Sequence, residues 1–329
     1  MTVSLSEKVI LVTGGTGSFG QKFTEIVLRE HNTKAIRIFS RGELLQEEMR
    51  RRFEDDQRLR FFIGDVRDRE RIHRAMNGVD IVVHAAALKQ VPACEYNPIE
   101  AIRTNIDGAI NVIDAAIDNG IEKVIAISTD KAVYPVNLYG ATKLVAEKLF
   151  VQANAYTGFG KTRFSCVRYG NVVGSRGSVI PLFLEQRKTG ETTITDERMT
   201  RFWITSEQGV RFVIKCVEIM SGGEIFIPKI PSVRITDLAD VIAPGAQRKV
   251  IGIRPGEKLH EALMPGEEAR HAREFDDYFV VEPEFVFWGK ADLKGGKALA
   301  ESFTYTSDTN NWWLSEDDLN KMLTEFKDE

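Results

Sequence analysis

A glycine-rich turn directly after an apolar run constrains the fold of this chain more than any other feature. Residues 8–14 predict a buried strand, and a helical pattern extends from the turn to about residue 29. Glycines spaced three apart allow a tight turn, close approach of the backbone to a pyrophosphate, and close packing of helix on strand. The helix N-terminus adds N–H donors for an anion. The flanking strand and helix favour a dinucleotide site over a plain turn. The expected cofactor-binding residues here are Gly14, Thr16, Gly17, Ser18, Phe19 and Gly20.

Further apolar runs alternate with helical patterns along the chain. The runs lie at residues 35–40, 60–66, 80–87, 124–127, 163–168 and 224–227. This alternation predicts an α/β fold with a Rossmann-type, doubly wound parallel sheet whose ligands lie at the carboxyl ends of the strands. We expect residues 1–170 to form a dinucleotide-binding domain, with about 197–228 returning to it. A smaller, discontinuous α/β substrate-binding lobe is expected from residues 171–196 and 229–329.

The end of the second apolar run bears on the choice of cofactor. About twenty residues past the glycines, an acidic residue would bind the 2′-hydroxyl of NAD. Ser40 and Arg41 stand there instead and suit the 2′-phosphate of NADP. In the alternative, Arg41 is exposed beside Glu43, and Glu43 binds an unphosphorylated ribose. We favour NADP. Further cofactor contacts are expected at the next strand ends, from Asp65, Val66, Ala85 and Ala86.

A polar segment after the fifth apolar run carries the candidate chemistry. It spans residues 127–143 and enters a helix at Asn137, a good N-cap residue. Tyr139 and Lys143 are four apart and share one face of this helix. An ammonium lowers the pKa of a nearby phenol, which is ordinarily near 10, so Tyr139 is a candidate base. Taken alone, the pair is more often a solvated helix face. The candidate catalytic residues are Thr129, Asp130, Lys131, Tyr139 and Lys143.

Basic and polar side chains in turn-like contexts predict a site for an anionic substrate. Arginine matches phosphate geometry, although each such residue taken singly is also explained as surface charge. Residues 251–258 are expected to form a strand, a turn and a helix start, which would place an arginine near a pyrophosphate. The predicted substrate-binding residues are Lys89, Asn171, Arg176, Ser178, Arg201, Arg254 and Glu257.

Composition excludes several classes of partner. The net charge is −4, so no global field attracts nucleic acid or an anionic membrane. The chain has three cysteines, Cys94, Cys166 and Cys216, which are scattered and lack metal-ligand spacing. They are expected to be small buried hydrophobes in a reducing compartment. No apolar run reaches the length of a membrane span, and the polar start does not resemble a signal peptide. We expect a cytoplasmic protein without a bound metal.

Nearly the whole chain resembles the extended short-chain dehydrogenase/reductase superfamily. The glycine turn and the pair Tyr139 and Lys143 are features of the whole superfamily. More specific segments are residues 85–92, 95–98, 128–131, 137–143, 167–172 and 252–260. This set resembles the soluble, inverting UDP-N-acetylglucosamine 4,6-dehydratases that start pseudaminic acid synthesis. Gln90 stands where such proteins often have His, and the C-terminal segment matches the family pattern least.

The resemblance implies a lyase acting on UDP-N-acetylglucosamine and a homo-oligomer, either a dimer or a hexamer. In the implied reaction, Tyr139 assisted by Lys143 deprotonates the C4 hydroxyl, and Thr129 hydrogen-bonds the C4 oxygen. Lys131 takes the C5 proton, and Asp130 protonates the departing C6 hydroxyl. We expect burial to raise the pKa of Asp130 and to keep Lys131 neutral.

Three other functions are alternatives to an inverting 4,6-dehydratase. A sugar-nucleotide epimerase would share the fold, the cofactor and the Tyr/Lys pair, but typically has a Ser or Thr pair in place of residues 129–131. Many retaining dehydratases are membrane-anchored and lack this tyrosine. A non-catalytic NADP-binding regulator usually loses the tyrosine or the lysine. The sequence therefore favours the inverting dehydratase.

Overall fold

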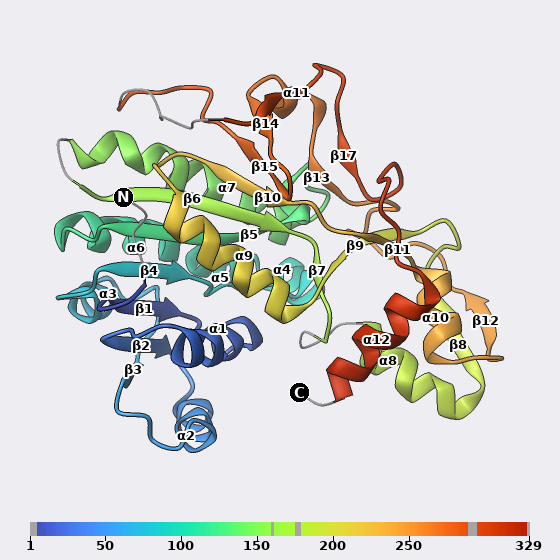
Figure 1. Ribbon diagram of the computed structural model, residues 1–329. Coiled ribbons are helices and arrows are strands. Elements are labelled where there is room, and N and C mark those ends of the chain that lie inside the picture. The colour runs from blue at the N-terminus through green and yellow to red at the C-terminus, as the bar shows by residue number, and fades with distance from the viewer. Residues whose placement is uncertain (1–4, 159–160, 175–178, 289–294, 328–329) are drawn as a thin grey trace.

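A ten-stranded sheet forms the centre of the protein (Figure 1). The computed structural model describes residues 5–158, 161–174, 179–288 and 295–327. The strands of this sheet are β1 (Val9–Thr13), β2 (Ala35–Ser40), β3 (Leu59–Ile63), β4 (Ile81–His84), β5 (Lys123–Thr129), β6 (Arg163–Tyr169), β10 (Ile225–Pro228), β14 (Ala272–Glu274), β15 (Tyr278–Val281) and β16 (Lys297–Ala298). Their order is β16-β14-β15-β10-β6-β5-β4-β1-β2-β3. The strands from β10 to β3 are parallel, which confirms the predicted doubly wound sheet.

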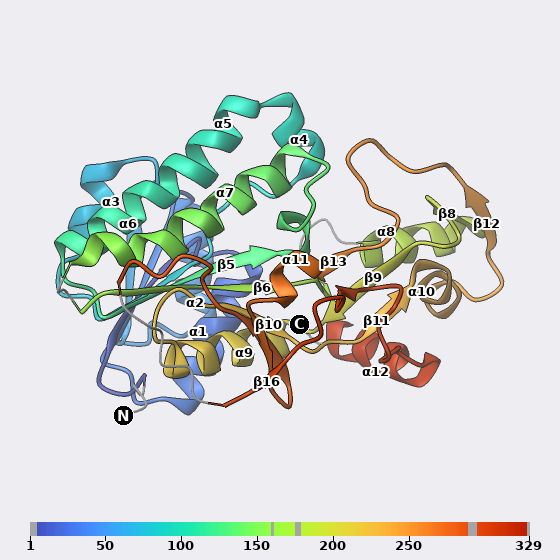
Figure 2. The ribbon, with the colours of Figure 1, turned by 90° about the horizontal axis from the view of Figure 1, so that it is seen from above.

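Helices cover both faces of this sheet (Figure 2). On one face lie α1 (Ser18–Glu30) and α9 (Ser206–Ile219), packed on each other, while α2 (Glu43–Arg52) packs beside β2 and β3. The other face carries α3 (Arg69–Met76), α4 (Val91–Tyr96), α5 (Pro98–Ile102), α6 (Gly108–Asp118) and α7 (Leu138–Ala153). A π-helical turn, Arg103–Asp107, joins α5 to α6.

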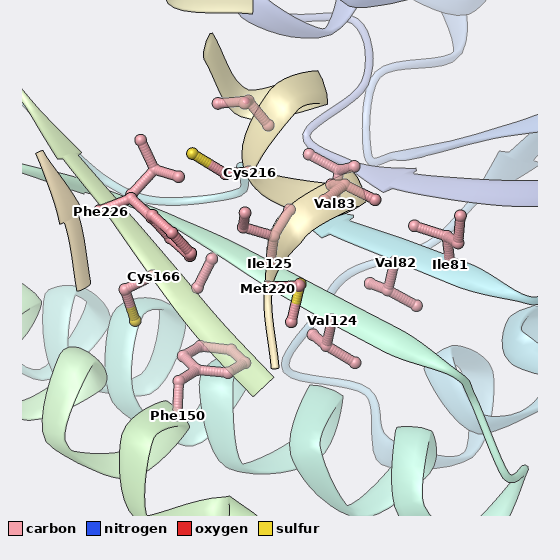
Figure 3. Close-up of a cluster of buried hydrophobic side chains, with 14 of the residues drawn as sticks. Ile81, Val82, Val83, Val124, Ile125, Phe150, Cys166, Cys216, Met220 and Phe226 are labelled. Carbon is pink, nitrogen blue, oxygen red and sulfur yellow. The ribbon is translucent and has the colours of Figure 1, made fainter. Parts of the chain in front are cut away.

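The core between the sheet and its helices is apolar and contains two of the cysteines. Cys166 on β6 and Cys216 on α9 lie among Val124, Phe150 and Phe226 in the cluster shown in Figure 3. All three cysteines are buried free thiols, as their scattered positions predicted. Burial raises the pKa of the Cys166 and Cys216 thiols, so these two side chains remain small neutral hydrophobes.

A smaller lobe with its own apolar core lies beside the carboxyl ends of the parallel strands (Figure 1). Its elements are β7 (Asn171–Val172), α8 (Val179–Gln186), β8 (Glu191–Ile194), β9 (Thr200–Ile204), β11 (Ser232–Arg234), α10 (Ile235–Ile242), β12 (Gln247–Val250) and α12 (Glu316–Lys327). β9 lies between β7 and β11 in one small sheet, and β8 pairs with β12 in another. The antiparallel pair β13 (Ala262–Met264) and β17 (Tyr305–Thr306), together with α11 (Gly266–Ala269), adjoins both parts.

The structure differs from the sequence prediction at residues 251–258. The strand β12 ends at Val250, and the next eight residues contain neither the expected strand nor the start of a helix. Gly252 and Gly256 have φ of +85° and +79°, and Pro255 lacks a donor, so the segment cannot continue a ladder.

The C-terminal part of the chain contributes to both parts of the fold. β14, β15 and β16 fall within residues 229–329, yet they extend the main sheet rather than the lobe. The predicted division into two domains stays a prediction. Within the described ranges, no helix combines the length and apolar character that crossing a bilayer requires.

Candidate active site

A cavity of about 810 Å³ lies at the carboxyl ends of the parallel strands, next to the lobe. It brings together most of the residues predicted from sequence: Gly14, Thr16, Gly17, Ser18, Phe19, Ser40, Arg41, Asp65, Val66, Ala85, Ala86, Lys89, Thr129, Lys131, Tyr139, Lys143 and Asn171. Lining residues that the sequence did not single out include Thr104, Ser128, Tyr169, Trp203 and Ser206. Loops that follow separate strands thus meet at one edge of the sheet.

The glycine turn fits the pyrophosphate of a dinucleotide. A Cβ on Gly14, which has φ of +67°, would lie 2.9 Å from the backbone of Ala86. A Cβ on Gly20 would lie 2.3 Å from the carbonyl oxygen of Gly15, so this glycine packs the helix on the turn instead of lining the cavity. Gly17 is the N-cap of α1 and supplies no side-chain cap, which leaves the first N–H groups of the helix available to an anion.

Two arginines, Arg41 and Arg67, lie beside the carboxylate of Asp65, a predicted cofactor-binding residue. The Ser40 hydroxyl accepts a hydrogen bond of 3.0 Å from Gln46. Arg41 is more than half exposed, with Nη1 3.8 Å from Oδ2 of Asp65. Arg67 donates to the same carboxylate at 2.7 and 2.9 Å. Burial raises the pKa of Asp65, but the hydrogen bonds from Arg67 outweigh burial and hold the pKa below its usual value.

The helix that carries Tyr139 starts at a fully organised N-terminus. Asn137 caps it, since Oδ1 accepts from the backbone N–H of Gly140 at 2.7 Å. Glu95 accepts from the N–H of Leu138 at 2.7 Å, which also places a negative charge at the positive end of the helix dipole. The Asn137 amide donates to the carbonyl of Gly256 at 2.8 Å. The loop after β12 and the segment after β4 therefore both fix the start of α7.

Tyr139 and Lys143 are buried and line the cavity together. The Lys143 ammonium donates to the carbonyl of Ile127 at 2.6 Å. Burial raises the pKa of Tyr139 to about 12, against the opposing charge of Lys131. The expectation that Lys143 lowers this pKa is therefore wrong for the protein without ligands, because desolvation disfavours the phenolate more than nearby cations favour it. Burial also lowers the pKa of Lys143.

Asp130 lies behind the cavity wall and reaches the cavity through its two sequence neighbours. Thr129 Oγ1 donates to Asp130 Oδ1 at 2.8 Å, and Lys131 Nζ donates to the same oxygen at 3.0 Å. Asp130 is fully buried, and its Oδ2 has no hydrogen-bond partner among the described residues. Burial raises the pKa of Asp130, with Lys131 opposing, in the direction a general acid needs.

A second buried carboxylate also contacts Lys131. Glu261 Oε1 lies 3.5 Å from Lys131 Nζ, and Glu261 is 2% exposed. Burial lowers the pKa of Lys131, but the charges of Asp130 and Glu261 raise it by more than burial lowers it. The resting side chain is therefore an ammonium. The expectation of a neutral Lys131 is wrong because burial arrives together with two anions. Sequence reasoning missed Glu261; a lone carboxylate next to the apolar residues 262–264 was the available signal.

Asn105 is another buried polar residue that sequence reasoning missed. Its amide donates to the carbonyl of Leu88 and to Thr142 Oγ1, each at 2.9 Å, and its oxygen accepts from the N–H of Leu88 at 2.8 Å. It lies in the π-helical turn Arg103–Asp107, which no sequence pattern marked. Asn105 thereby ties the segment after β4 to the helix that carries Tyr139.

Arg201 does not line the cavity. Its guanidinium is buried and donates to the carbonyls of Thr200, Leu259 and Lys258 at 2.7, 3.1 and 3.0 Å. Nε lies 3.9 Å from Glu261 Oε1. These contacts brace the segment that precedes β13.

The remaining predicted substrate residues divide into three groups. Asn171 lines the cavity, and its Oδ1 is buried without a hydrogen-bond partner in the described part of the chain. Arg254 is exposed, and its Nη1 lies 3.7 Å from Glu257 Oε1; neither residue lines the cavity. Arg176 and Ser178 lie outside the described residues. All assigned roles stay predictions. Within the described residues, no group of three His, Cys, Asp or Glu side chains is arranged to hold a metal ion.

The fold and the cavity define an α/β protein of the short-chain dehydrogenase/reductase type. The chain belongs to the family described as polysaccharide biosynthesis protein, whose profile matches residues 10–283. It is 52% identical to a UDP-N-acetylglucosamine 4,6-dehydratase (inverting) from Campylobacter jejuni, over 97% of this chain and 98% of that one. The predicted resemblance is confirmed, and that likeness also bears out an enzyme of the lyase class.

Two further relatives were compared. The crystal structure of Pen from Bacillus thuringiensis superposes with a TM-score of 0.90 at 39% identity and covers 99% of both chains. A UDP-glucose 4-epimerase from Rickettsia massiliae is 44% identical over 92% of this chain and 91% of that one. The family thus contains proteins named for two different reactions.

Proposed function

We propose that this chain catalyses the NADP-dependent 4,6-dehydration of UDP-N-acetylglucosamine with inversion at C5. The product would be a UDP-4-keto-6-deoxy-L-arabino-hexosamine. The observation that carries the proposal is the 3.0 Å hydrogen bond from Lys131, which is partly exposed in the cavity, to the fully buried Asp130. Both lie beside Tyr139 at the cavity that the glycine turn also lines. The 52% identity to a relative named for this reaction supports it.

The cofactor would lie along the strand ends. The glycine turn would hold its pyrophosphate, Arg41 its 2′-phosphate, and Asp65 its adenine, while Ala85 and Ala86 leave room for it. When bound, NADP supplies a hydride acceptor at C4 and later a hydride donor at C6, so the net redox change is zero.

The side chains of the chain would manage the protons. The phenolate of Tyr139 would be favoured over the phenol by the positive charge of an oxidised nicotinamide. As a phenolate, Tyr139 would take the proton of the C4 hydroxyl, and Thr129 would hydrogen-bond the C4 oxygen. With C4 as a ketone, the C5 proton lies α to a carbonyl and becomes acidic enough for Lys131 to remove. Asp130 gives its proton to the departing C6 hydroxyl, which leaves as water.

A single proton transfer would create both the acid and the base. The resting pair is an ammonium and a carboxylate joined by the hydrogen bond from Lys131 Nζ to Asp130 Oδ1. Moving that proton breaks one N–H bond, forms one O–H bond, and leaves an amine and a carboxylic acid. Removal of the C5 proton and donation to the leaving hydroxyl return the pair to its resting form. The proton that Tyr139 took from the C4 hydroxyl is then the one left to reprotonate C5.

Epimerisation at C4 is the second candidate, favoured by the 44% identity to a protein named UDP-glucose 4-epimerase. That reaction needs the Tyr139 base and the dinucleotide, but neither an acid for C6 nor a base for C5. The Asp130–Lys131 pair would then have no chemical role.

One product assay separates the candidates. The protein is incubated with NADP and UDP-N-acetylglucosamine in deuterium oxide and followed by NMR, with Tyr139→Phe as the inactive control. Dehydration predicts loss of the C6 hydroxymethyl signals, a C6 methyl group and deuterium at C5. An unchanged hydroxymethyl group with inverted C4 would establish epimerisation instead. Light scattering on the same sample tests the expected dimer or hexamer.

A further inference from the structure

We call residues 129–133 the catalytic turn. A short segment before β13 brings two charged side chains to this turn from 120 to 130 residues further along the chain. We call residues 258–261 the bracing segment. Lys258 Nζ donates to the carbonyl of Val133 at 2.6 Å and to that of Asp130 at 3.3 Å. Glu261 Oε1 lies 3.5 Å from Lys131 Nζ. The bracing segment therefore holds both the backbone of the catalytic turn and the side chain of its lysine.

Glu261 is held in place from several directions. Its N–H donates to Ser307 Oγ at 2.9 Å, and its carbonyl accepts from the N–H of Ser307 at 2.8 Å. Its carboxylate lies 3.3 Å from Lys258 Nζ and 3.9 Å from Arg201 Nε. Burial raises the pKa of Glu261, but Lys131 and these two cations together hold the pKa below its usual value. Glu261 is thus a fixed, ionised carboxylate.

We propose that Glu261 is a positioning residue for the proton couple, a fixed counter-ion that holds Lys131 Nζ beside Asp130 and retains their shared proton. The chemical role of the couple rests on the proposed function. Lys131 lies between two carboxylates, at 3.0 Å from Asp130 and 3.5 Å from Glu261. Only Asp130 and Lys131 exchange a proton in the reaction, whereas Glu261 keeps one charge throughout.

The sign of the effect follows from the charges around Lys131. Among the described residues, Asp130 faces it from its own turn, Tyr139 from α7, Arg201 from β9, and Glu261 with Lys258 from the bracing segment. Without the charge of Glu261, the positive charges of Arg201 and Lys258 are uncompensated. They would then favour loss of the shared proton, so the couple would deprotonate at lower pH.

The test uses Glu261→Gln, which keeps the shape of the side chain and removes its charge. Protein labelled with ¹³C at lysine Cε is titrated by NMR, with the Lys131 signal assigned from Lys131→Arg. In the wild type the Lys131 signal should titrate only at the alkaline end of the pH range in which the protein stays folded. In the variant the midpoint of this titration should move to lower pH by about 1–3 units. The alkaline limb of the kcat–pH profile should move in the same direction, and KM should change little. An unchanged Lys131 titration would overturn the proposal.

Two further variants separate this role from a loss of stability. Glu261→Asp retains the charge but withdraws it from Lys131 by the length of one methylene group. Its Lys131 titration should therefore lie between those of the wild type and Glu261→Gln. If Glu261→Gln does not fold, this intermediate shift carries the test, and its absence would overturn the proposal. Glu224→Gln is the matched control, a fully buried carboxylate bonded to Ser165 and to the N–H groups of Ser221 and Gly222. It should leave the Lys131 titration unchanged.

The titration needs no substrate, so the two proposals can fail separately. A shifted Lys131 signal in a protein that leaves UDP-N-acetylglucosamine unchanged would retain the counter-ion and reject the proposed reaction. If the wild type is active but the Glu261→Gln variant shows the wild-type Lys131 titration and pH profile, the proposed reaction would be retained and the counter-ion role of Glu261 rejected.

Discussion

Glu147 on α7 and Arg168 on β6 form a two-pronged ion pair inside the protein. Nε donates to Oε1 at 3.0 Å and Nη2 to Oε2 at 2.7 Å, and both side chains are 1% exposed. Glu147 lies one turn beyond Lys143 on the helix that carries Tyr139. Arg168 also donates to Glu268 of α11. One guanidinium therefore joins the candidate catalytic helix, the main sheet and the C-terminal part of the chain.

Arg168→Met should destabilise the protein by about 3–5 kcal/mol, because it leaves Glu147 charged and unpaired in the core. Urea unfolding measures the change. Arg168→Lys is the matched control, because it keeps the charge but cannot make both hydrogen bonds of the planar guanidinium. Its free energy of unfolding should lie between those of the wild type and Arg168→Met. A loss below about 1 kcal/mol for Arg168→Met would show that the pair contributes little.

Asp130→Asn should lower the dehydration rate by on the order of a hundredfold or more, because the amide cannot protonate the leaving hydroxyl. The substitution keeps the side-chain shape, so folding and NADP binding should be retained; circular dichroism and a cofactor titration check both. Turnover close to that of the wild type would remove Asp130 from the role of acid.

Arg41→Ala should weaken NADP binding by about tenfold or more, the effect of losing a hydrogen bond to a charged group, and should weaken NAD binding far less. Calorimetric titration of both cofactors measures the difference. Arg69→Ala, at an exposed arginine of α3, serves as a control for the loss of surface charge. Equal effects on the two cofactors would refute the 2′-phosphate contact and favour Glu43 as a ribose ligand.

His84 should make the fold less stable in acid. It is buried, and Nδ1 lies 2.8 Å from Thr13 Oγ1. Burial, with a smaller contribution from Lys143, lowers the pKa of His84 to about 3. An unfolded histidine has a pKa near 6.5. Between these values the unfolded chain binds a proton that the folded chain does not, so the unfolding free energy falls as pH falls, by up to about 1.4 kcal/mol per pH unit.

His84→Gln removes this contribution while it keeps a side chain capable of hydrogen bonding to Thr13. Urea unfolding of both proteins from pH 7.5 down to pH 5 should therefore show a smaller loss of stability for the variant. Parallel curves would mean that His84 becomes protonated in the folded state.

Local sequence was sufficient for much of the fold and for part of the site. The apolar runs matched the parallel strands because the central strands, such as β1, β4 and β5, are buried on both faces and need a continuous apolar stretch. The glycine turn could be predicted from sequence because Gly14 and Gly20 have no room for a side chain, so both positions require glycine. Asn137 marked the start of α7 through a bond to Gly140, three residues away. Each of these signals is contained within a few residues.

Sequence did not reveal the contacts of charged residues whose partners are distant in sequence. The substrate role of Arg201 stays a prediction, but its hydrogen bonds to the carbonyls of residues 258 and 259 appear only in the packed structure. The pKa of Lys131 was expected to fall through burial, but Asp130 beside it and Glu261, 130 positions away, together raise it. Burial and a nearby opposite charge shift the pKa of a group in opposite directions. Only the packed structure shows which of the two effects is larger.

Sequence by itself determined the Rossmann-type sheet, the dinucleotide turn and the Tyr139–Lys143 spacing, because local periodicity and steric limits specify them. Tertiary structure alone decided that Lys131 lies between Asp130 and Glu261 and that Arg168 joins three parts of the chain. Those contacts depend on which buried charges meet after folding, and the electrostatic energy of a buried group depends on neighbours that sequence spacing does not reveal.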